Sequence, residues 1–220
     1  MNSKERIAKA AVSELLEGSV INLGIGIPTL IPRYLPNDAY YIHTENGLLG
    51  VAELDENSID VERVNAGKLP VGESIGASYF GSSSSFAMIR GGHIDIAVLG
   101  ALQIDQSGKI ANWSIPGKSI LGVGGAMDLL TGAKKIIVTT THLANDGTSK
   151  FLKECSYPIT SNRIVDVLIT DKAIFRWKNN QYELSKIYSD VTIEEIVNHT
   201  EAYFAIPSNV EIIEVKENGE

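Results

Sequence analysis

The sequence of 220 residues predicts an α/β fold, in which helices cover both faces of an open, mostly parallel β-sheet. Three features indicate this class: short, almost entirely apolar runs typical of strands buried on both faces, helix-forming segments that alternate with them, and glycine-rich turns between the two. No linker, internal repeat or low-complexity block interrupts the pattern, so we expect one domain over residues 1–220. The apolar runs cover residues 94–99, 135–139 and 165–169.

An amphipathic helix is expected to open the chain. Asn2 and Glu5 have the spacing of a reciprocal N-terminal cap, and the apolar residues that follow recur on one helical face. Gly18 is expected to end this helix, because glycine readily adopts the left-handed conformation common after a helix. The apolar face consists of Ile7, Ala10, Ala11 and Leu15.

Two short strands and a second helix are predicted next. The strands cover residues 19–23 and 40–44. Pro28 suits the first position of the helix between them, where a missing N–H costs no helical hydrogen bond. The acidic, polar residues 53–60 are predicted to form an exposed loop.

The later helices carry end signals of their own. The serines at 82–85 are expected to cap a helix over residues 86–90, and the glycine pair at 91–92 to end it. Thr192 and Glu195 predict a second capping box, which opens a last helix.

Composition restricts the classes of function. A formal net charge of −8 and the lack of a basic run argue against a general nucleic-acid binder. No apolar run approaches the roughly 20 residues of a membrane span, and the charged N-terminus is unlike a signal peptide, so we expect a cytoplasmic protein. Cys155 is the only cysteine, and the four histidines lack metal-ligand spacing, so neither a disulfide nor a metal site is predicted.

Glu45 is the strongest candidate for chemistry. It follows the apolar strand at 40–44 and precedes Asn46-Gly47, a turn-forming pair. A charged group at the end of a buried strand is costly unless it is used, and α/β proteins place their chemistry in the loops after strand ends. For this residue alone, a carboxylate that only hydrogen-bonds its own turn is the alternative.

Two glycine-rich turns precede expected helices. Gly24-x-Gly26-x-x-Thr29, with an acid about twenty residues later, is similar to a dinucleotide-binding fingerprint. However, Thr29 replaces the third glycine and Pro28 removes a backbone donor, so a tight structural turn is favoured. The second turn, at residues 122–125, can expose backbone N–H groups to an anion or a developing oxyanion, although helix packing explains it as well.

Together these segments resemble the B (β) subunit of family I coenzyme A transferases, the succinyl-CoA:3-ketoacid and acetate/acetoacetate group. The resemblance covers nearly the whole chain, from Asn22 to Ala205, and depends on the order and spacing of its motifs. In chain order these motifs are Asn22-Leu23-Gly24-Ile25-Gly26-Ile27-Pro28, Glu45-Asn46-Gly47, Asn65-Ala66-Gly67-Lys68, Gly76-Ala77-Ser78-Tyr79-Phe80, residues 85–95, Ala111-Asn112-Trp113, residues 124–129 and Lys153-Glu154-Cys155.

The resemblance implies roles for five residues. The glutamate of the Glu-Asn-Gly motif is the family's nucleophile, which is Glu45 here. Gly125 is similar to the glycine whose backbone N–H faces the oxyanion. Lys68 looks like a contact to coenzyme A, and Asn65 and Gly124 are implied as further contacts. The implied reaction moves coenzyme A from an acyl-CoA to a short-chain or 3-oxo carboxylic acid through a glutamyl-CoA thioester, without a permanently bound cofactor.

Departures from the family pattern leave the acyl specificity open. Thr44 stands where serine is usual, and Leu121 stands where several relatives carry a lysine. The run at residues 139–142 lacks the glutamate that often precedes its histidine.

A partner chain is also implied, because the family's active site lies between two related halves and this chain resembles only the C-terminal half. A separate A (α) subunit, or a fused N-terminal half, would complete a heterodimer that can pair into a heterotetramer. Two other functions stay open. One is a sugar-phosphate isomerase of the same broad superfamily, in which Glu45 would transfer a proton, and the other is a non-catalytic ligand-sensing protein.

Overall fold

A large mixed sheet forms the centre of the computed structural model, which describes residues 2–36, 39–55, 57, 59–65, 67–118, 120 and 122–215. Its strands are β1 (Val20–Leu23), β2 (Tyr41–Thr44), β3 (Leu48–Ala52), β4 (Gly72–Tyr79), β5 (Ile96–Gly100), β8 (Lys135–Thr139), β10 (Val167–Ile169), β11 (Ala173–Lys178), β12 (Gln181–Tyr188) and β13 (Glu211–Ile213). Within the described residues the strand order is β13-β12-β11-β10-β8-β5-β1-β2-β3-β4.

The centre of this sheet is parallel and its margins are antiparallel. Strands β10, β8, β5, β1 and β2 run parallel to their neighbours within this group. The hairpins β3–β4 and β11–β12 continue the sheet on the two sides by antiparallel pairing. The predicted α/β class with an open, mostly parallel sheet is therefore confirmed, and the antiparallel margins add to it.

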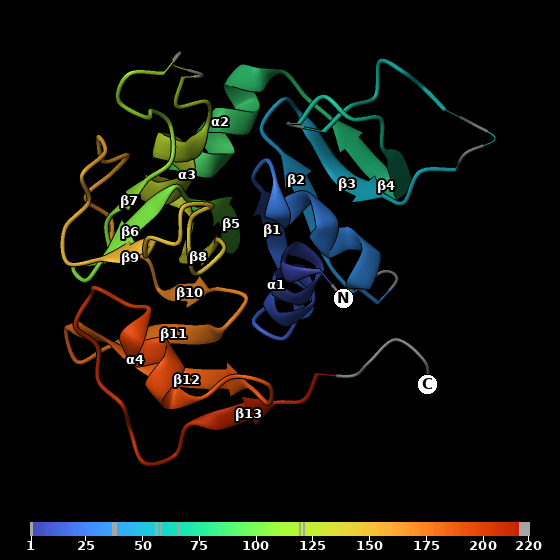
Figure 1. Ribbon diagram of the computed structural model, residues 1–220. Coiled ribbons are helices and arrows are strands. Elements are labelled where there is room, and N and C mark those ends of the chain that lie inside the picture. The colour runs from blue at the N-terminus through green and yellow to red at the C-terminus, as the bar shows by residue number, and fades with distance from the viewer. Residues whose placement is uncertain are drawn as a thin grey trace.

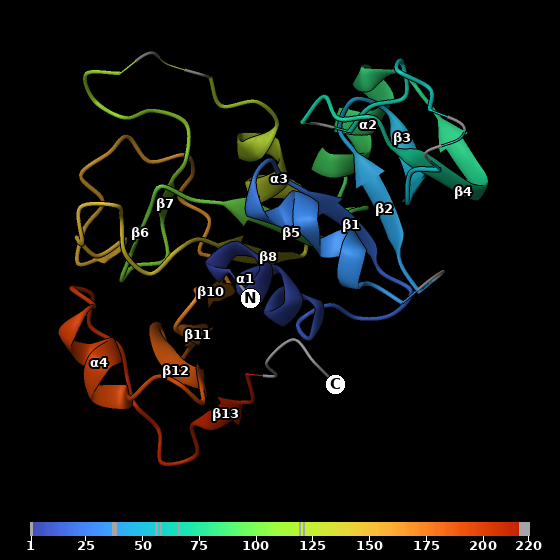
Figure 2. The ribbon, with the colours of Figure 1, turned by 45° about the vertical axis from the view of Figure 1, so that its right-hand side comes forward.

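Helices lie on both faces of the sheet. The helices are α1 (Ser3–Val12), the 3-10 helix η1 (Ile27–Tyr34), α2 (Ser82–Arg90), α3 (Ala126–Gly132) and α4 (Ile193–Asn198). Helix α1 packs against η1, and α2 packs against α3 (Figures 1 and 2). The crossovers through η1 and α3 lead in opposite directions along the sheet. Since such crossovers are right-handed, the two helix pairs cover opposite faces.

A small second sheet lies beside the large one. Its strands are β6 (Gln103–Asp105), β7 (Ile110–Ala111) and β9 (Phe151–Leu152), in the order β7-β6-β9. Figure 1 shows this sheet on the left of the view, next to β8, with β11, β12 and α4 below it.

The hydrophobic core follows the parallel strands, as the apolar runs predict. Strands β5, β8 and β10 bury nearly every residue, which requires cover on both faces. The α1 residues Ile7, Ala8 and Ala11 are fully buried against this centre. The core extends to Phe175 and Leu184 in the antiparallel hairpin, so the margins share one apolar cluster with the centre.

Helix ends agree only in part with the sequence predictions. The reciprocal Asn2–Glu5 cap of α1 is confirmed. The expected stop at Gly18 is wrong, because α1 ends at Val12 and Gly18, with φ 76°, lies in the following turn. Pro28 lies in the first turn of its helix, as predicted, although that helix is 3-10. Gly91 ends α2, as predicted.

Two predicted serine and threonine caps differ from the structure. The serines at 82–85 do not cap α2 but form its first turn, because the N-cap is Gly81, with no side-chain cap. At α4 only half of the capping box forms. Thr192 accepts a hydrogen bond from the Glu195 N–H at 3.1 Å, whereas the Glu195 carboxylate pairs with Lys172.

An open strand edge ends the large sheet. Among the described residues β4 has a neighbour on one side only, β3. Its side chains are mostly exposed on both faces, with Ile75 fully exposed and Tyr79 59% exposed.

Candidate active site

Glu45 lies in a tight turn at the carboxyl end of β2 and is half-buried. The Gly47 N–H donates to the Thr44 carbonyl at 3.0 Å, and the Phe80 N–H donates to the Gly47 carbonyl at 3.0 Å. Gly47 has φ 120°, and a Cβ there would lie 2.0 Å from the Phe80 carbonyl oxygen. Only glycine fits this position, so the Glu-Asn-Gly turn is held against the end of β4.

The turn borders the place where the chain changes direction along the sheet. From β1 the chain proceeds to β2 on one side, and later to β5 on the other. The Gly24 N–H donates to the Val98 carbonyl at 2.8 Å, and a Cβ on Gly100 would lie 3.3 Å from the Ile25 carbonyl oxygen. Ligands of open α/β sheets bind at such switch points, outside the carboxyl ends of the strands. The first glycine-rich turn therefore permits close approach of two strand ends.

The structure brings Gly125 against the Glu45 carboxyl group. A Cβ built on Gly125 would lie 3.4 Å from both Oε1 and Cγ of Glu45. Gly125 is the N-cap of α3. Gly124 has φ 53° and faces open space. The second glycine-rich turn thus leaves room for a ligand beside the carboxylate.

Asn46 links the Glu45 turn to the loop that carries Asn65 and Lys68. Its side-chain amide donates to the Val64 carbonyl at 2.8 Å. Asn65 Oδ1 accepts hydrogen bonds from the backbone N–H groups of Gly67 at 2.8 Å and Leu69 at 3.1 Å. Asn65 therefore shapes the loop through this oxygen.

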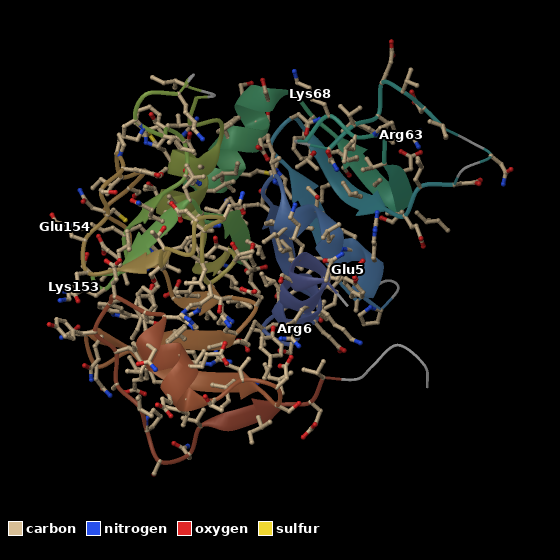
Figure 3. All side chains as sticks on the ribbon, viewed as in Figure 1. Glu5, Arg6, Arg63, Lys68, Lys153 and Glu154 are labelled. Carbon is tan, nitrogen blue, oxygen red and sulfur yellow. The ribbon has the colours of Figure 1, made fainter. Side chains whose placement is uncertain are left out.

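Lys68 is held in an uncommon backbone conformation, with φ 61°. Non-glycine residues rarely adopt such a positive φ. Figure 3 shows Lys68 at the upper side of the molecule, near α2 and the β3–β4 hairpin. The turn thus presents the Lys68 side chain on the same side as the Glu45 turn.

A cavity of about 370 Å³ lies beside the same turn. Leu23, His43, Thr44 and Asn65 belong to its lining. A larger and shallower hollow of about 650 Å³ lies at Lys153, beside α4. Figure 1 shows α4 in the lower part of the view, far from β2, so the smaller cavity is the one next to the candidate nucleophile.

Three buried polar side chains that the sequence did not single out surround Glu45. Asn22, His43 and Ser85 are 0%, 1% and 0% exposed. The Asn22 side-chain amide donates to Glu45 Oε2 at 3.4 Å and lies 3.1 Å from His43 Nδ1. Ser85 Oγ lies 3.0 Å from His43 Nε2. A polar residue in each short apolar strand, Asn22 in β1 and His43 in β2, was the available signal.

Burial keeps His43 uncharged. Removal from water lowers the pKa of its imidazole to about 4. The ring stacks on Phe80, with ring centroids 5.8 Å apart. His43 therefore acts in the site as a neutral hydrogen-bonding group.

Other titratable candidates have structural roles. Asp95, Asp166 and Asp171 accept hydrogen bonds from the backbone N–H groups of Val20, Ile136 and His142. Burial raises the pKa of the Cys155 thiol to about 12, which disfavours the thiolate. Among the described residues no group of three His, Cys, Asp or Glu side chains could hold a metal ion. In the same part of the chain no helix is long and apolar enough to span a membrane.

Arg63 and Arg90, two further candidate cations, are engaged in ion pairs. Arg63 contacts Asp60 and Glu73, each at 3.5 Å. Arg90 contacts Asp128 at 2.9 Å. Both pairings support structural roles for these arginines.

Comparison with known proteins gives matches over almost the whole chain. The family model described as Coenzyme A transferase matches residues 4–199. The Helicobacter pylori protein named as the B chain of succinyl-CoA:3-ketoacid coenzyme A transferase is 47% identical over 204 residues, which cover 92% of this chain and 99% of that protein. The β subunit of the acetate CoA-transferase of Escherichia coli is 42% identical over 211 residues, 96% of this chain and 97% of that protein.

A solved structure gives the same fold. The acyl-CoA transferase apoenzyme of Escherichia coli superposes with a TM-score of 0.78 at 23% identity. The match covers 96% of this chain and 43% of that longer chain.

Proposed function

Because the chain belongs to the coenzyme A transferase family, we propose that it is the B (β) subunit of a two-subunit enzyme with Glu45 as the nucleophile. The enzyme moves coenzyme A between an acyl-CoA and a short-chain or 3-oxo carboxylic acid. The single observation that carries the proposal is the Glu45 carboxyl group, presented at the end of β2 with Gly125 against it.

The first step forms a mixed anhydride. A Glu45 carboxylate oxygen attacks the carbonyl carbon of the donor acyl-CoA, the carbon–sulfur bond breaks, and coenzyme A leaves as its thiolate. A carboxylate nucleophile keeps the acyl group activated, whereas attack by water would hydrolyse the thioester. The room beside Gly125 permits the acyl carbonyl to approach the carboxylate.

The second step forms the glutamyl-CoA thioester. The thiolate attacks the Glu45 carbonyl carbon, and the donor acid leaves as a carboxylate. The acceptor carboxylate then attacks the thioester and the same steps run in reverse, which regenerates Glu45 and releases the new acyl-CoA. Each attack passes through a tetrahedral oxyanion, for which the Gly125 N–H is the proposed donor, and losing one such donor typically costs ~2.7–4 kcal/mol.

Coenzyme A is proposed to bind along the loop of residues 64–69. The cavity of about 370 Å³ has an apolar part formed by Leu23, Ile42 and Leu69. This lining suits the uncharged pantetheine arm, whose thiol has to reach Glu45. Lys68, with Asn65 and Gly124 nearby in the proposed site, offers a point charge to a polar or anionic part of the coenzyme.

An A (α) subunit is proposed to complete the site. The match to the Helicobacter pylori protein, whose name makes it one of two kinds of chain, covers nearly all of both sequences. By contrast, the chain covers less than half of the longer acyl-CoA transferase, as expected if that chain contains both halves. We infer a heterodimer that can pair into a heterotetramer.

Chemical trapping tests the proposal. The complex of this chain with its α subunit is incubated with acetoacetyl-CoA and then with borohydride or hydroxylamine, and the peptides are analysed by mass spectrometry. A modification confined to Glu45 is expected. A proton-transferring isomerase or a ligand-sensing protein would leave Glu45 unmodified, and coenzyme exchange without an adduct at Glu45 would contradict the proposed nucleophile.

A further inference from the structure

His43 and Asn22 form a buried hydrogen-bonded pair directly behind Glu45. Their contact joins Asn22 Nδ2 and His43 Nδ1 at 3.1 Å, and the same Nδ2 donates to Glu45 Oε2 at 3.4 Å. Both side chains are excluded from solvent, with exposed fractions of 0% and 1%. Water therefore cannot replace either partner.

The carboxylate fixes the orientation of the Asn22 amide. An ionised carboxylate only accepts hydrogen bonds, so the Asn22 atom that faces Glu45 has to be Nδ2. The second hydrogen on Nδ2 then points to His43 Nδ1, which must be an unprotonated acceptor. Asn22 Oδ1 is left buried without a hydrogen-bond partner among the described residues, and burying such an atom is a cost that the Nδ2 contacts have to offset.

The orientation of Asn22 in turn fixes the tautomer of His43. With Nδ1 unprotonated, the ring proton of the neutral imidazole is on Nε2 and donates to Ser85 Oγ at 3.0 Å. The Ser85 hydroxyl can then donate to the Thr44 carbonyl at 3.4 Å. The chain of contacts Ser85–His43–Asn22–Glu45 thus has one consistent assignment of its protons.

We propose that His43 is a positioning residue for the reaction, which locks the Asn22 amide in the orientation that holds Glu45 Oε2. A flipped amide would place Oδ1 against both the carboxylate and the lone pair of Nδ1, so the neutral imidazole opposes the flip. Because Oε2 is held, Oε1 is the oxygen directed at Gly125, where a built Cβ would lie 3.4 Å from it. His43 therefore selects which carboxylate oxygen meets the acyl carbonyl. This inference rests on the proposed function.

The substitution His43→Leu, made in the complete complex, removes the acceptor for Asn22. We expect kcat to fall about 10- to 100-fold, because a displacement of the nucleophile by about 1 Å can cost 10²-fold, while KM for the acyl-CoA stays within about twofold. The matched variant His43→Gln offers an oxygen to Asn22 and an N–H to Ser85, and is expected to restore kcat to within about threefold of wild type. Full kcat in His43→Leu, or equal losses in both variants, would overturn the proposal.

A double-mutant cycle separates positioning from a general structural effect. If His43 acts through Asn22, then His43→Leu should cause no further loss of kcat in an Asn22→Ala background. Additive losses would overturn the proposal. Thermal melts of the four proteins show whether any loss reflects unfolding.

Nitrogen-15 NMR of the wild-type chain gives a readout that needs no activity. At pH 7 the His43 ring is expected to be neutral, with the proton on Nε2. A proton on Nδ1, or a charged imidazolium, would overturn the proposal. Failure of the proposed function is distinguishable, because it would appear as a wild-type complex that forms no Glu45 adduct, whatever the His43 tautomer.

Discussion

At the scale of single residues, the candidate site was partly predictable. Glu45 and Gly125 stand 80 positions apart in the sequence, and the structure brings them into contact distance. Glu45 carried a local signal, a charge at the end of an apolar strand. Asn22 and His43 did not, because a single polar residue in a strand shows its partner only once β1 and β2 are paired.

The substitution Glu45→Asp shortens the nucleophile by one methylene group. Because the Glu-Asn-Gly turn is held by backbone hydrogen bonds, the carboxylate cannot follow the substrate, and kcat should fall about 10²-fold. Steady-state exchange between acetoacetyl-CoA and an acid acceptor measures the change. Glu154→Asp, at an exposed acid on the opposite side of Figure 3, is the matched control. Near-normal turnover of Glu45→Asp would argue against the nucleophile.

Gly125→Ala adds a methyl group next to the carboxylate. The φ of −81° suits alanine, so the backbone is not strained, but the new Cβ would lie 3.4 Å from Oε1 and Cγ of Glu45. We expect kcat to fall about tenfold or more, with little change in melting temperature, because the acyl carbonyl loses its room. Gly81→Ala is the control, since its φ is −64° and its Cβ would meet only Ser83 Oγ at 3.9 Å. Equal activity of both variants would contradict the predicted crowding.

At the scale of elements, the sequence predicted the buried centre better than the margins. Strands β5, β8 and β10 are buried on both faces and read as continuous apolar runs. Strands β3 and β4 are partly exposed, so their apolar pattern is broken. The β11–β12 hairpin had a usable signal that was missed: Asn179 and Asn180 both have positive φ, 50° and 63°, as a two-residue hairpin turn requires.

The loop of residues 64–69 gives a prediction about coenzyme binding. Lys68→Asn removes the positive charge and keeps the positive φ, because asparagine tolerates the left-handed region. KM for the acyl-CoA should rise about three- to tenfold, and less at high salt, where screening weakens the charge. Lys153→Asn removes an exposed lysine on the far side of Figure 3 and should leave KM unchanged. An unchanged KM in Lys68→Asn would remove Lys68 from the proposed binding site.

At the scale of the whole molecule, buried neutral histidines couple stability to pH. Burial lowers the pKa of His43 and of His142 to about 4, from an ordinary value of 6.5. Below pH 6.5 the unfolded chain binds protons that the folded chain does not, so stability is lost as pH falls from 6.5 towards 4.

Between pH 7 and pH 5 the free energy of unfolding should fall by about 2 kcal/mol for each of these histidines. Urea titrations at the two pH values measure it. His142→Gln should reduce the pH dependence by about half of the combined effect, whereas His93→Gln, at a more exposed histidine, should leave it unchanged. A pH dependence that His142→Gln does not alter would contradict the assignment.

The interpretation of residues 1–220 as one domain stays a prediction, supported by an apolar cluster that runs from Ile7 in α1 to Leu184 in β12. We expect a single unfolding transition, with coincident midpoints in circular dichroism and tryptophan fluorescence. Two separate midpoints would show that the antiparallel margin folds as its own unit.

The open edge of β4 has a consequence for how the protein must be made. Unpaired N–H and C=O groups on an exposed strand can template the same strand of another copy, and the fully exposed Ile75 adds apolar surface to that contact. A surplus of this chain over whatever molecule covers β4 would extend the sheet from copy to copy and precipitate. Cells should therefore synthesise the two in step, and recombinant yield should depend on their ratio.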